Sequence, residues 1–598
     1  MELSPDVIRQ VVLPTAALYP PPEPPAAAAP EPPADDGDGW QTSWLNPKNR
    51  IDSLDLPRNP SWRIDGCIAY GTQLFAVPLF LGPTAPQRVD VFLPSDAGAA
   101  TPALRLALDL GTAFHTRDAR ATRQLGLARH VVRLLQHWTA GASSPARRYR
   151  QFPFGSRIVL HNLPVHVADA HISVAPAHHL ERQLLSVAQL RAMWQHDDDD
   201  DELPETVDLG ALRYESQPHD SVSIVRLGAH TLVFKAITSH TKYLYHELRQ
   251  LLRTPPHPNV IARPRHLVTK RCGFGAKTAV VGFTLTHHRH GTVRDHIPHL
   301  ALHGRLAHRD EVRWARQLVR ALRHVRAAAS GGGGGSSGGG GGAFYSDLRL
   351  DNVLLSDDGR DLILVDFEQR GVWSEFAAPE INAVECVREL AMAEEEDGVA
   401  GGVPEEVRAR CAGLLARMLP HWEALVDGEA YGWPAGRHGY NVAWQCLAPA
   451  EQESCEVYML GRVLWCLFEA QSAPQRAAVW TSYRCEPAVE FPAYARTPPA
   501  LRRLVDWCTA GRVPTLSSVV VRSGSTLVLR ELETTGGSTP ENVRAAAAAF
   551  WRRRIAESER WVRNHIESRE AGRANEAFPD RPSLAAVEAF LDAYDDKL

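Results

Sequence analysis

Hydrophobic positions along this chain follow two patterns, short β-prone runs and longer stripes with a helical period. The β-prone runs predict strands at 88–93, 157–161, 223–227 and 231–237. Apolar side chains recur at helical spacing in the segments that predict helices, at 118–138, 179–194, 242–252 and 310–326. Together the two patterns predict an α+β fold.

Stretches of biased composition divide the chain into regions. Residues 14–39 are rich in Pro, Ala and acidic residues, which predicts a disordered tail. An acidic run predicts a self-repelling linker, and a Gly-rich tract at 330–342 predicts a flexible insertion. The resulting regions are a tail (1–39), an N-terminal α/β region of unknown role (40–195), the acidic linker (196–204), a second domain (205–520) and a C-terminal helical extension (521–598).

Bulk composition narrows the class of protein. The chain has 598 residues, 44% of them hydrophobic, which is ample for several packed domains. Its formal net charge of −5 gives no reason to expect a nucleic-acid partner. The cysteines form no Cys-x-x-Cys pair and the start does not resemble a signal peptide, so we expect an intracellular protein, cytoplasmic or nuclear. Every apolar stretch is too short for a bilayer, so we expect no membrane partner.

The strongest local signal is a hairpin flanked by polar residues. Two short apolar runs within 353–365 enclose a turn with an Asp-Gly pair, which is typical of tight hairpins. A hairpin brings its ends together, so Asn352 and Asp366 should emerge side by side, with Asp347 on the loop before the first strand. Three oxygen-bearing side chains at one strand end suit magnesium and phosphate chemistry. The alternative is an ordinary hairpin flanked by solvated acids.

The segments that flank this hairpin, 345–352 and 366–368, resemble the catalytic loop and the magnesium loop of the eukaryotic protein-kinase-like superfamily. The family pattern is His-Arg-Asp-Leu-Lys-x-x-Asn, followed by Asp-Phe-Gly. This chain has Tyr-Ser in place of His-Arg, Arg349 in place of Lys and Glu368 in place of Gly. Its divergent motifs are also similar to kinase-like proteins of filamentous fungi.

The resemblance implies a role for each polar residue of the two loops. Asp347 would orient the substrate hydroxyl, and Arg349 would steady the transferring phosphoryl group. Asn352 and Asp366 would hold Mg²⁺ ions that accompany ATP.

Residues before the hairpin supply candidates for the nucleotide side. Lys235 ends an apolar strand-like run, and Glu247 lies on the helix that follows. The resemblance implies that they form the ion pair that positions ATP phosphates; the alternative is a surface Lys and a solvated Glu. The glycine-rich loop of the family is missing, and Gly228 is the single glycine where we expect that loop.

Residues after the hairpin supply candidate structural anchors. Ala-Pro-Glu ending at Glu380 resembles the motif that closes the activation segment of kinases, and Arg512 is the expected partner of its carboxylate. A rival Ala-Pro-Ala-Glu motif occupies 448–451. If the rival motif closes the segment, residues 382–447 are an insertion in it; if it does not, they are an added helical unit. We favour Glu380. Glu456 stands where the family has an Asp that holds the catalytic-loop backbone.

The expected fold is therefore a bilobal protein-kinase-like fold with an additional N-terminal α/β region. The expected activity is transfer of phosphate from ATP, with Mg²⁺, to a Ser or Thr hydroxyl of a protein substrate. Two alternatives stay open: a pseudokinase that acts as a binding scaffold, and a kinase of small molecules.

Overall fold

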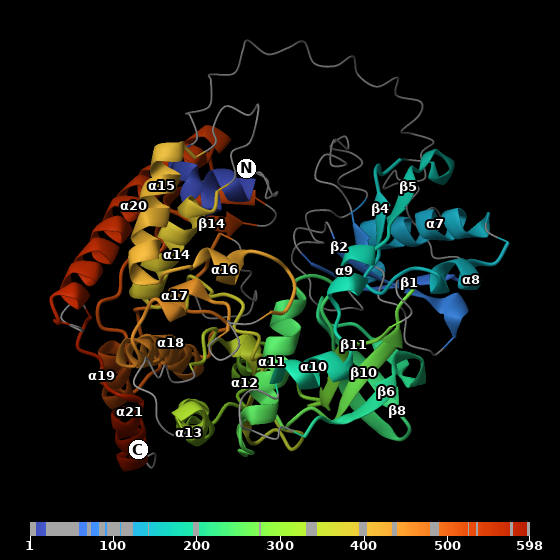
Figure 1. Cartoon of the computed structure of the whole chain (residues 1–598). Helices are drawn as coiled ribbons and strands as arrows, with labels where there is room; N and C mark the ends of the chain where they lie inside the picture. Colours follow the sequence, from blue (N-terminus) through green and yellow to red (C-terminus); the bar gives the residue numbers. More distant parts are fainter. Residues whose placement is uncertain are drawn as a thin grey trace, which may run out of the picture.

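The structure is a computed structural model. It describes residues 7–18, 59–68, 73–82, 90–92, 108, 123–141, 143–164, 166–194, 202–273, 277–330, 344–393, 403–432, 439–478, 489–523, 526–533, 536–573 and 578–594. Most of the acidic linker (196–204) and of the Gly-rich tract (330–342) lies outside these residues. Helices and strands are mixed along the chain (Figure 1), and the predicted α+β class is confirmed.

The N-terminal region is built on a five-stranded sheet with strands in chain order. Neighbouring strands are antiparallel except β3 and β4, which are parallel. Trp62 and Ile64 of β1 share a core with Val131 and Leu135 of helix α7. The strands are β1 (Trp62–Ile68), β2 (Gln73–Pro78), β3 (Asp90–Phe92), β4 (Arg157–Leu160) and β5 (Ile172–Ala175), covered by α7 (Gly126–Ala140) and α8 (Pro145–Arg150).

The helix predicted at 179–194 is two helices, α9 (His178–Gln183) and α10 (Val187–Trp194). Ser186 interrupts it, because its hydroxyl accepts from the Gln189 N–H while the Gln189 side chain accepts from the Ser186 N–H. This reciprocal pair is a capping box that starts α10. Both helices join the core of the next sheet.

A second sheet has six strands in the order β6-β10-β11-β9-β8-β7. Only the β6–β10 pair is parallel among the pairs described in this sheet. The strands are β6 (Glu205–Asp208), β7 (Arg213–Ser216), β8 (Val222–Leu227), β9 (His230–Lys235), β10 (His266–Arg271) and β11 (Thr278–Thr286). Helix α11 (Thr241–Arg253) follows β9 and buries Leu244 and Leu248 in the same core.

Helices and a small hairpin extend that core away from the second sheet. The long helices α13 and α18 run through it, and the hairpin β12–β13 lies against α13. These elements are α12 (Val293–Leu302), α13 (His308–Ser330), η8 (Leu350–Asn352), β12 (Val353–Leu355), β13 (Leu362–Leu364), α18 (Pro449–Glu469) and α19 (Pro499–Cys508).

A further helical layer forms the left side of Figure 1, where α20 lies along α14 and α15. Its elements are α14 (Pro379–Ala391), α15 (Glu405–Met418), α16 (Glu423–Val426), α17 (Val442–Gln445), β14 (Val520–Ser523), β15 (Thr526–Leu529) and α20 (Pro540–Glu570); α21 (Leu584–Ala593) packs on α13. Short helical turns complete the chain: η4 (Leu79–Leu81), η6 (Val167–Asp169), η7 (Leu209–Ala211), η9 (Leu516–Ser518) and η10 (Arg530–Leu532).

The start of the chain differs from the disordered tail expected over 1–39. Residues 7–18 form the short turns η1 (Ile8–Val12) and η2 (Pro14–Ala17), which pack on α20. Val11 is fully buried there, and its carbonyl accepts from Trp551 Nε1 at 2.9 Å. Apolar residues before the Pro-rich stretch therefore complete a core with the C-terminal extension. The rest of the expected tail lies outside the described residues.

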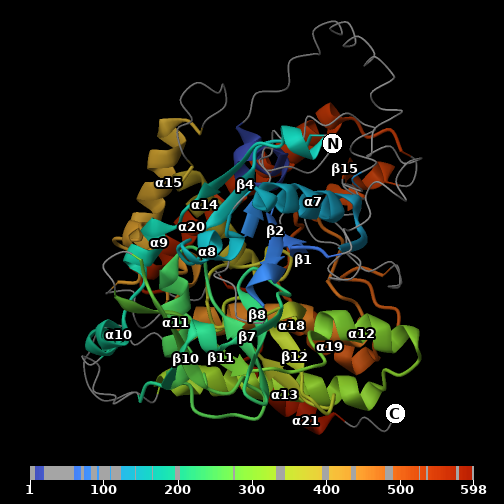
Figure 2. The ribbon, with the colours of Figure 1, turned by 90° about the vertical axis from the view of Figure 1, so that its right-hand side faces the viewer.

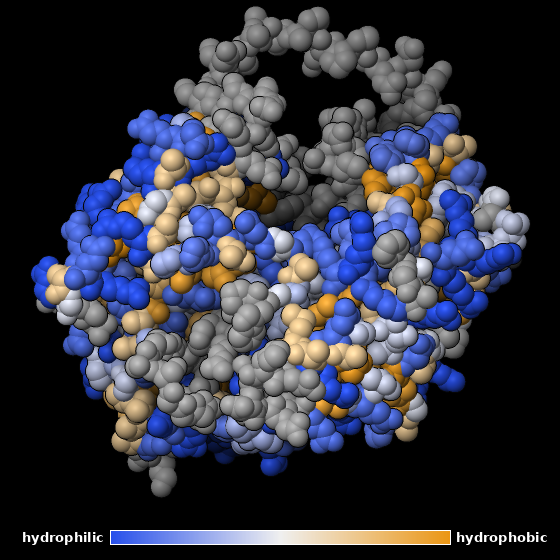
Figure 3. Space-filling model, in the orientation of Figure 1, coloured by the Kyte–Doolittle hydropathy of each residue, from blue (hydrophilic) through white to orange (hydrophobic). Residues whose placement is uncertain are grey.

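The described helices include none with the length and apolar character needed to cross a membrane. On the face drawn in Figure 3, hydrophobic and hydrophilic residues are interspersed.

Candidate active site

The predicted hairpin is present, and it sets the geometry of the site. Val353 of β12 lies opposite Leu364 of β13. At the open end, the Val365 N–H donates to the Asn352 carbonyl at 3.0 Å. Asn352 and Asp366 therefore emerge next to each other, as expected from the sequence.

Asp347 lies beside Asn352 and Arg349. The Asn352 Nδ2 group donates to the Asp347 carbonyl at 2.9 Å and to its Oδ2 at 3.3 Å. Arg349 Nε is 3.1 Å from Asp347 Oδ2, and the guanidinium lies over the Trp373 ring. Burial raises the pKa of Asp347 to about 6, against the lowering effect of Arg349.

Glu456 and the side chain of Tyr345 hold the segment 345–352 in place. Glu456 Oε1 accepts from the Tyr345 N–H at 2.6 Å, which places this acid as the sequence predicted. Its other oxygen accepts from Arg326 Nη1, also at 2.6 Å. The Tyr345 hydroxyl donates to the Val365 carbonyl, so this tyrosine links the loop directly to the residue before Asp366. The sequence showed Tyr345 only as a departure from the family pattern.

Lys235 is the centre of the charged cluster. Its Nζ lies 2.6 Å from Glu247 Oε2, so the predicted ion pair is present. The same amine lies 2.6 Å from Asp366 Oδ1 and 3.1 Å from Glu368 Oε1. The other Glu247 oxygen accepts from the Phe367 N–H at 3.0 Å, which ties α11 to the segment around Asp366. Glu368, seen in the sequence only as a missing glycine, is therefore part of the site.

This cluster has one amine for three carboxyl groups, whose oxygens lie within 4.8 Å of one another. Burial acts against the charged amine, but the acids outweigh it and raise the pKa of Lys235. Burial would raise the pKa of Asp366, yet Lys235 outweighs it and lowers that pKa. Burial raises the pKa of Glu247 to about 8, and it also raises the pKa of Glu368. Asp366 is therefore ionised, whereas burial disfavours the ionised forms of the two glutamates.

The loop next to Lys235 is not the one expected from the sequence. Gly228 lies in the turn between β8 and β9, at the end of β9 remote from Lys235. The connection at the Lys235 end is the loop 217–221 between β7 and β8, because Val222 of β8 pairs with Lys235. This loop has no glycine. The hydrophobic pattern did not reveal strand β7, and the expected position of this loop was therefore wrong.

The partner predicted for Glu380 is wrong. Arg581, not Arg512, pairs with its carboxylate, through Nη2 at 2.9 Å and Nη1 at 3.1 Å. The Arg581 side chain is 0% exposed, whereas that of Arg512 is 42% exposed and lies 3.1 Å from Asp506. Glu380 is in the first turn of α14, and Arg581 belongs to the segment just before α21. The C-terminal segment thus contacts the start of α14. The rival Glu451 accepts from the Ala448 N–H at 2.7 Å and caps α18.

The segment between Asp366 and Glu380 is anchored at Glu375. Arg462 donates to the Glu375 carbonyl through Nε at 2.9 Å and Nη2 at 2.6 Å. Its buried carboxylate accepts from Thr515 at 2.8 Å and from Gln475. The segment is thus fastened to α18 and to the residues near α19.

The unit 382–447 also reaches the charged cluster through α11. Lys242 donates to the carbonyls of Leu425 and Val426, both at 3.0 Å, at the end of α16. The Lys242 N–H donates to the Glu429 carbonyl at 3.2 Å. These contacts fix the first turn of α11, the helix that carries Glu247. No feature of the sequence pointed to this link.

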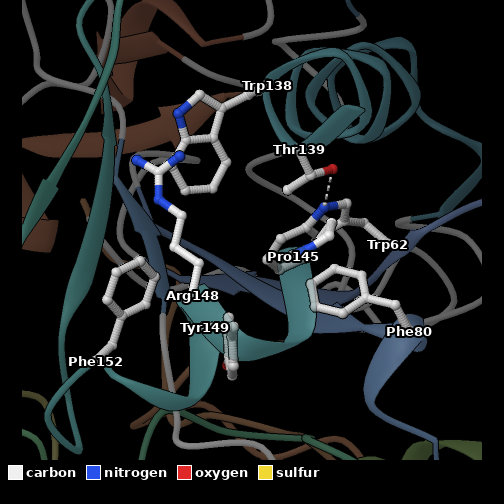
Figure 4. A pocket seen from close by; sticks show the side chains of 8 residues that line it. All are labelled: Trp62, Phe80, Trp138, Thr139, Pro145, Arg148, Tyr149 and Phe152. Carbon is white, nitrogen blue, oxygen red and sulfur yellow. Dashed lines mark hydrogen bonds between the residues drawn. The ribbon is translucent and has the colours of Figure 1, made fainter. Parts of the chain in front are cut away.

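An aromatic hollow on the N-terminal region lies apart from these charges (Figure 4). Its free volume is about 10 Å³, and it is lined by Trp62, Phe80, Trp138, Thr139, Pro145, Arg148, Tyr149 and Phe152. Trp62 and Phe80 meet edge to face, and Trp62 Nε1 donates to Thr139 at 3.3 Å. These contacts are those of aromatic packing. Among the residues named so far, the acids whose pKa values are raised all lie outside this hollow. The charged cluster around Lys235 is therefore the candidate active site.

No family model matches the chain, and no curated protein matches it. The proposed function therefore rests on the geometry of Lys235, Asp347 and Asp366.

Proposed function

We propose that this protein is an ATP- and magnesium-dependent phosphotransferase with a bilobal protein-kinase-like fold. In this proposal, the second sheet with α11 is the smaller lobe, and the helices around α13 and α18 form the larger one. The observation that carries it is the position of Lys235, which joins Glu247 of α11 to Asp366 at the open end of the hairpin. Asp347 and Asn352 lie at the same hairpin end.

Asp347 is the group suited to receive the proton of an attacking hydroxyl. With a pKa of about 6 it is ionised at neutral pH, and its side chain is 21% exposed. Arg349, 3.1 Å away, is placed to steady the transferred phosphoryl group. Lys235 would contact the phosphates of ATP by exchanging one of its acid partners for them.

Three carboxyl groups gathered around one amine fit a divalent cation, because Mg²⁺ prefers oxygen ligands. Asp366 is the most exposed acid of the cluster, at 32%, and Asn352 lies next to it. These two residues would hold the ion, with Glu368 close to Asp366. Bound Mg²⁺ would neutralise charge on the phosphate oxygens of ATP.

The proposal is tested with purified full-length protein, Mg²⁺ and ATP labelled in the γ-phosphate. We expect label on Ser or Thr of a protein substrate, with activity half-lost near pH 6 as Asp347 takes up a proton. Asp347→Ala should reduce the rate about 100- to 10,000-fold. Asp310→Ala, a carboxylate in the first turn of α13, is the control and should leave the rate unchanged. A rate that does not respond to Asp347→Ala would contradict the proposal.

A non-catalytic scaffold is the second candidate, from a different class. It is favoured by the pairing of Asp347 with Arg349 and of Lys235 with Glu368, since both reactive groups already have charged partners. Binding of MgATP without any transfer, in wild type as in Asp347→Ala, would establish the scaffold instead. Label found on small molecules and not on protein would point to a small-molecule kinase.

A further inference from the structure

One buried acid stands where the N-terminal region meets the second sheet. The pairing of β1 with β2 has a bulge between Ile64 and Gly66, and Asp65 lies in it. A bulge re-aims the side chain that it carries. The Asp65 side chain is 0% exposed, and Figure 2 shows β1 directly above β7 and β8.

Donors from both regions converge on the Asp65 carboxylate. From its own region, Arg63 Nε lies 2.6 Å and Arg123 Nη2 lies 3.0 Å from Oδ1. From the second sheet, the Tyr214 hydroxyl at 2.8 Å and the Gln217 N–H at 3.1 Å donate to Oδ2. Charge-assisted hydrogen bonds of this kind are stronger than neutral ones. Asp65 therefore fixes the end of β7 against the N-terminal region.

The segment held in this way is the loop 217–221. Arg63 Nη2 adds a bond to the Glu215 carbonyl at 2.9 Å, in a bulge of β7. At the far end of the loop, the Ser221 carbonyl accepts from the Ala236 N–H at 2.9 Å, directly after Lys235. The loop thus has one end tied to the N-terminal region and the other end tied to β9.

We propose that Asp65 is a positioning residue for nucleotide binding, which holds the loop 217–221 over the Lys235 cluster. This inference rests on the proposed function, since it takes the phosphates of ATP as the group beneath the loop. It also gives the N-terminal region a role: a fixed loop replaces the close backbone approach that glycines would allow. Because Asp65 touches neither ATP nor the acceptor, its loss should weaken ATP binding without changing the chemical step.

The test combines steady-state kinetics with amide hydrogen exchange on the full chain. For Asp65→Ala we expect the KM for MgATP to rise about tenfold, kcat to stay within about twofold, and exchange within 214–222 to become faster. Asp65→Asn keeps an oxygen that accepts hydrogen bonds and should restore part of the KM. Asp169→Ala changes an exposed acid of the same region and should alter neither quantity.

Exchange in α7 reports whether the N-terminal region of Asp65→Ala is still folded. If α7 loses protection, Tyr214→Phe takes the place of Asp65→Ala as the test variant. This change removes one donor and leaves Asp65 with its two arginines, and we then expect the KM for MgATP to rise about threefold. With α7 protected, unchanged exchange in 214–222 would overturn the proposal, and so would faster exchange with an unchanged KM. If the wild type does not bind MgATP, the proposed function fails and the nucleotide role of Asp65 with it. The exchange data alone then show whether Asp65 holds the loop.

Discussion

The two sides of the proposed active site are held in place by different kinds of contact. On the loop side, Asn352 donates to Asp347, which is 5 residues away in the sequence. On the strand side, the loop residue Gln217 is held by Asp65, at a separation of 152 residues.

Helix α11 is also held from far along the chain. Lys242 donates to the Leu425 carbonyl, 183 residues away. The loop side is therefore set mainly by one local hairpin, with Glu456 as its distant anchor, whereas the strand side is held by elements far along the chain. The difference teaches that the geometry of a proposed site can be set mainly by local sequence on one side and by distant packing on the other.

The largest effect is expected on the loop side, at the acid that faces Lys235. Asp366→Asn removes the ionised carboxylate proposed to hold Mg²⁺, and we expect the rate to fall about a hundredfold or more. Glu368→Gln is the matched change at a second, less exposed acid of the cluster and should reduce the rate less than about tenfold, because Asp366 remains. Rates measured over a range of Mg²⁺ concentrations should show a weaker apparent Mg²⁺ affinity only for Asp366→Asn. Equal losses of rate in the two variants would contradict the distinction between Asp366 as the Mg²⁺ ligand and Glu368 as its neighbour.

The next effect concerns stability and is independent of activity. Lys235→Met leaves buried acids without their cation, and we expect a loss of about 3–5 kcal/mol in the free energy of unfolding. An acid whose pKa is raised by folding makes the protein less stable as the pH rises from its unfolded pKa to its folded pKa. The loss of stability in Lys235→Met should therefore become smaller as the pH is lowered toward 4.5, the ordinary pKa of a glutamate such as Glu247. Urea unfolding at several pH values measures it.

The control for this change is Lys270→Met, on β10 of the same sheet, where the amine lies 3.4 Å from one glutamate. Its loss should be smaller and nearly independent of pH. If the loss of stability in Lys235→Met did not depend on pH, the charges of the cluster would not determine the stability of the strand side.

Glu456 tests how much of the loop side depends on a single buried acid. Glu456→Ala leaves the Tyr345 N–H and Arg326 without their acceptor, and we expect a loss of about 3 kcal/mol in stability. Glu456→Gln keeps an acceptor oxygen and should lose about half of that. Thermal or urea unfolding of both variants measures the difference. If both variants unfold like the wild type, the hairpin alone is enough to hold the loop.

The smallest effect is expected where α16 holds α11. Lys242→Met removes the bonds to the α16 carbonyls and should cost about 1–2 kcal/mol in stability, with a loss of activity below about tenfold. Lys277→Met is a close match, because its amine also donates to two carbonyls, of Arg182 and Leu184. We expect a similar loss of stability there and no loss of activity. Equal activity in the two variants would mean that α16 does not position Glu247.

The parts of the site that the sequence predicted are those with local causes. The Asp-Gly turn, the apolar runs beside it and the residues at their ends determine the hairpin, and hence the positions of Asn352 and Asp366. Lys235 and Glu247 were also placed correctly. A buried-facing lysine needs a charged partner, and the family resemblance pointed to Glu247 as that partner.

The parts that were missed depend on tertiary packing. Strand β7 is short and half-exposed, so its hydrophobic pattern is weak, and the loop near Lys235 was assigned to Gly228 instead. The pairing of Glu380 with Arg581 joins residues 201 positions apart, and nothing in the local sequence distinguishes Arg581 from Arg512. The N-terminal region, including Pro145–Arg150, showed no motif at all in the sequence. Its residue Asp65 nevertheless contacts the loop 217–221 near Lys235.

The packing of the first residues on α20 has a consequence for how the chain folds. Val11 and Trp551 are joined by a hydrogen bond across 540 residues, nearly the whole length of the chain. Contacts of such high sequence separation form late, because a long loop has to close before they add stability. During synthesis from the N-terminus, the apolar segment 7–18 leaves the ribosome long before its partner exists. Completion of this core can therefore only follow synthesis of α20, and it reports that the segment 7–18 has packed on that helix.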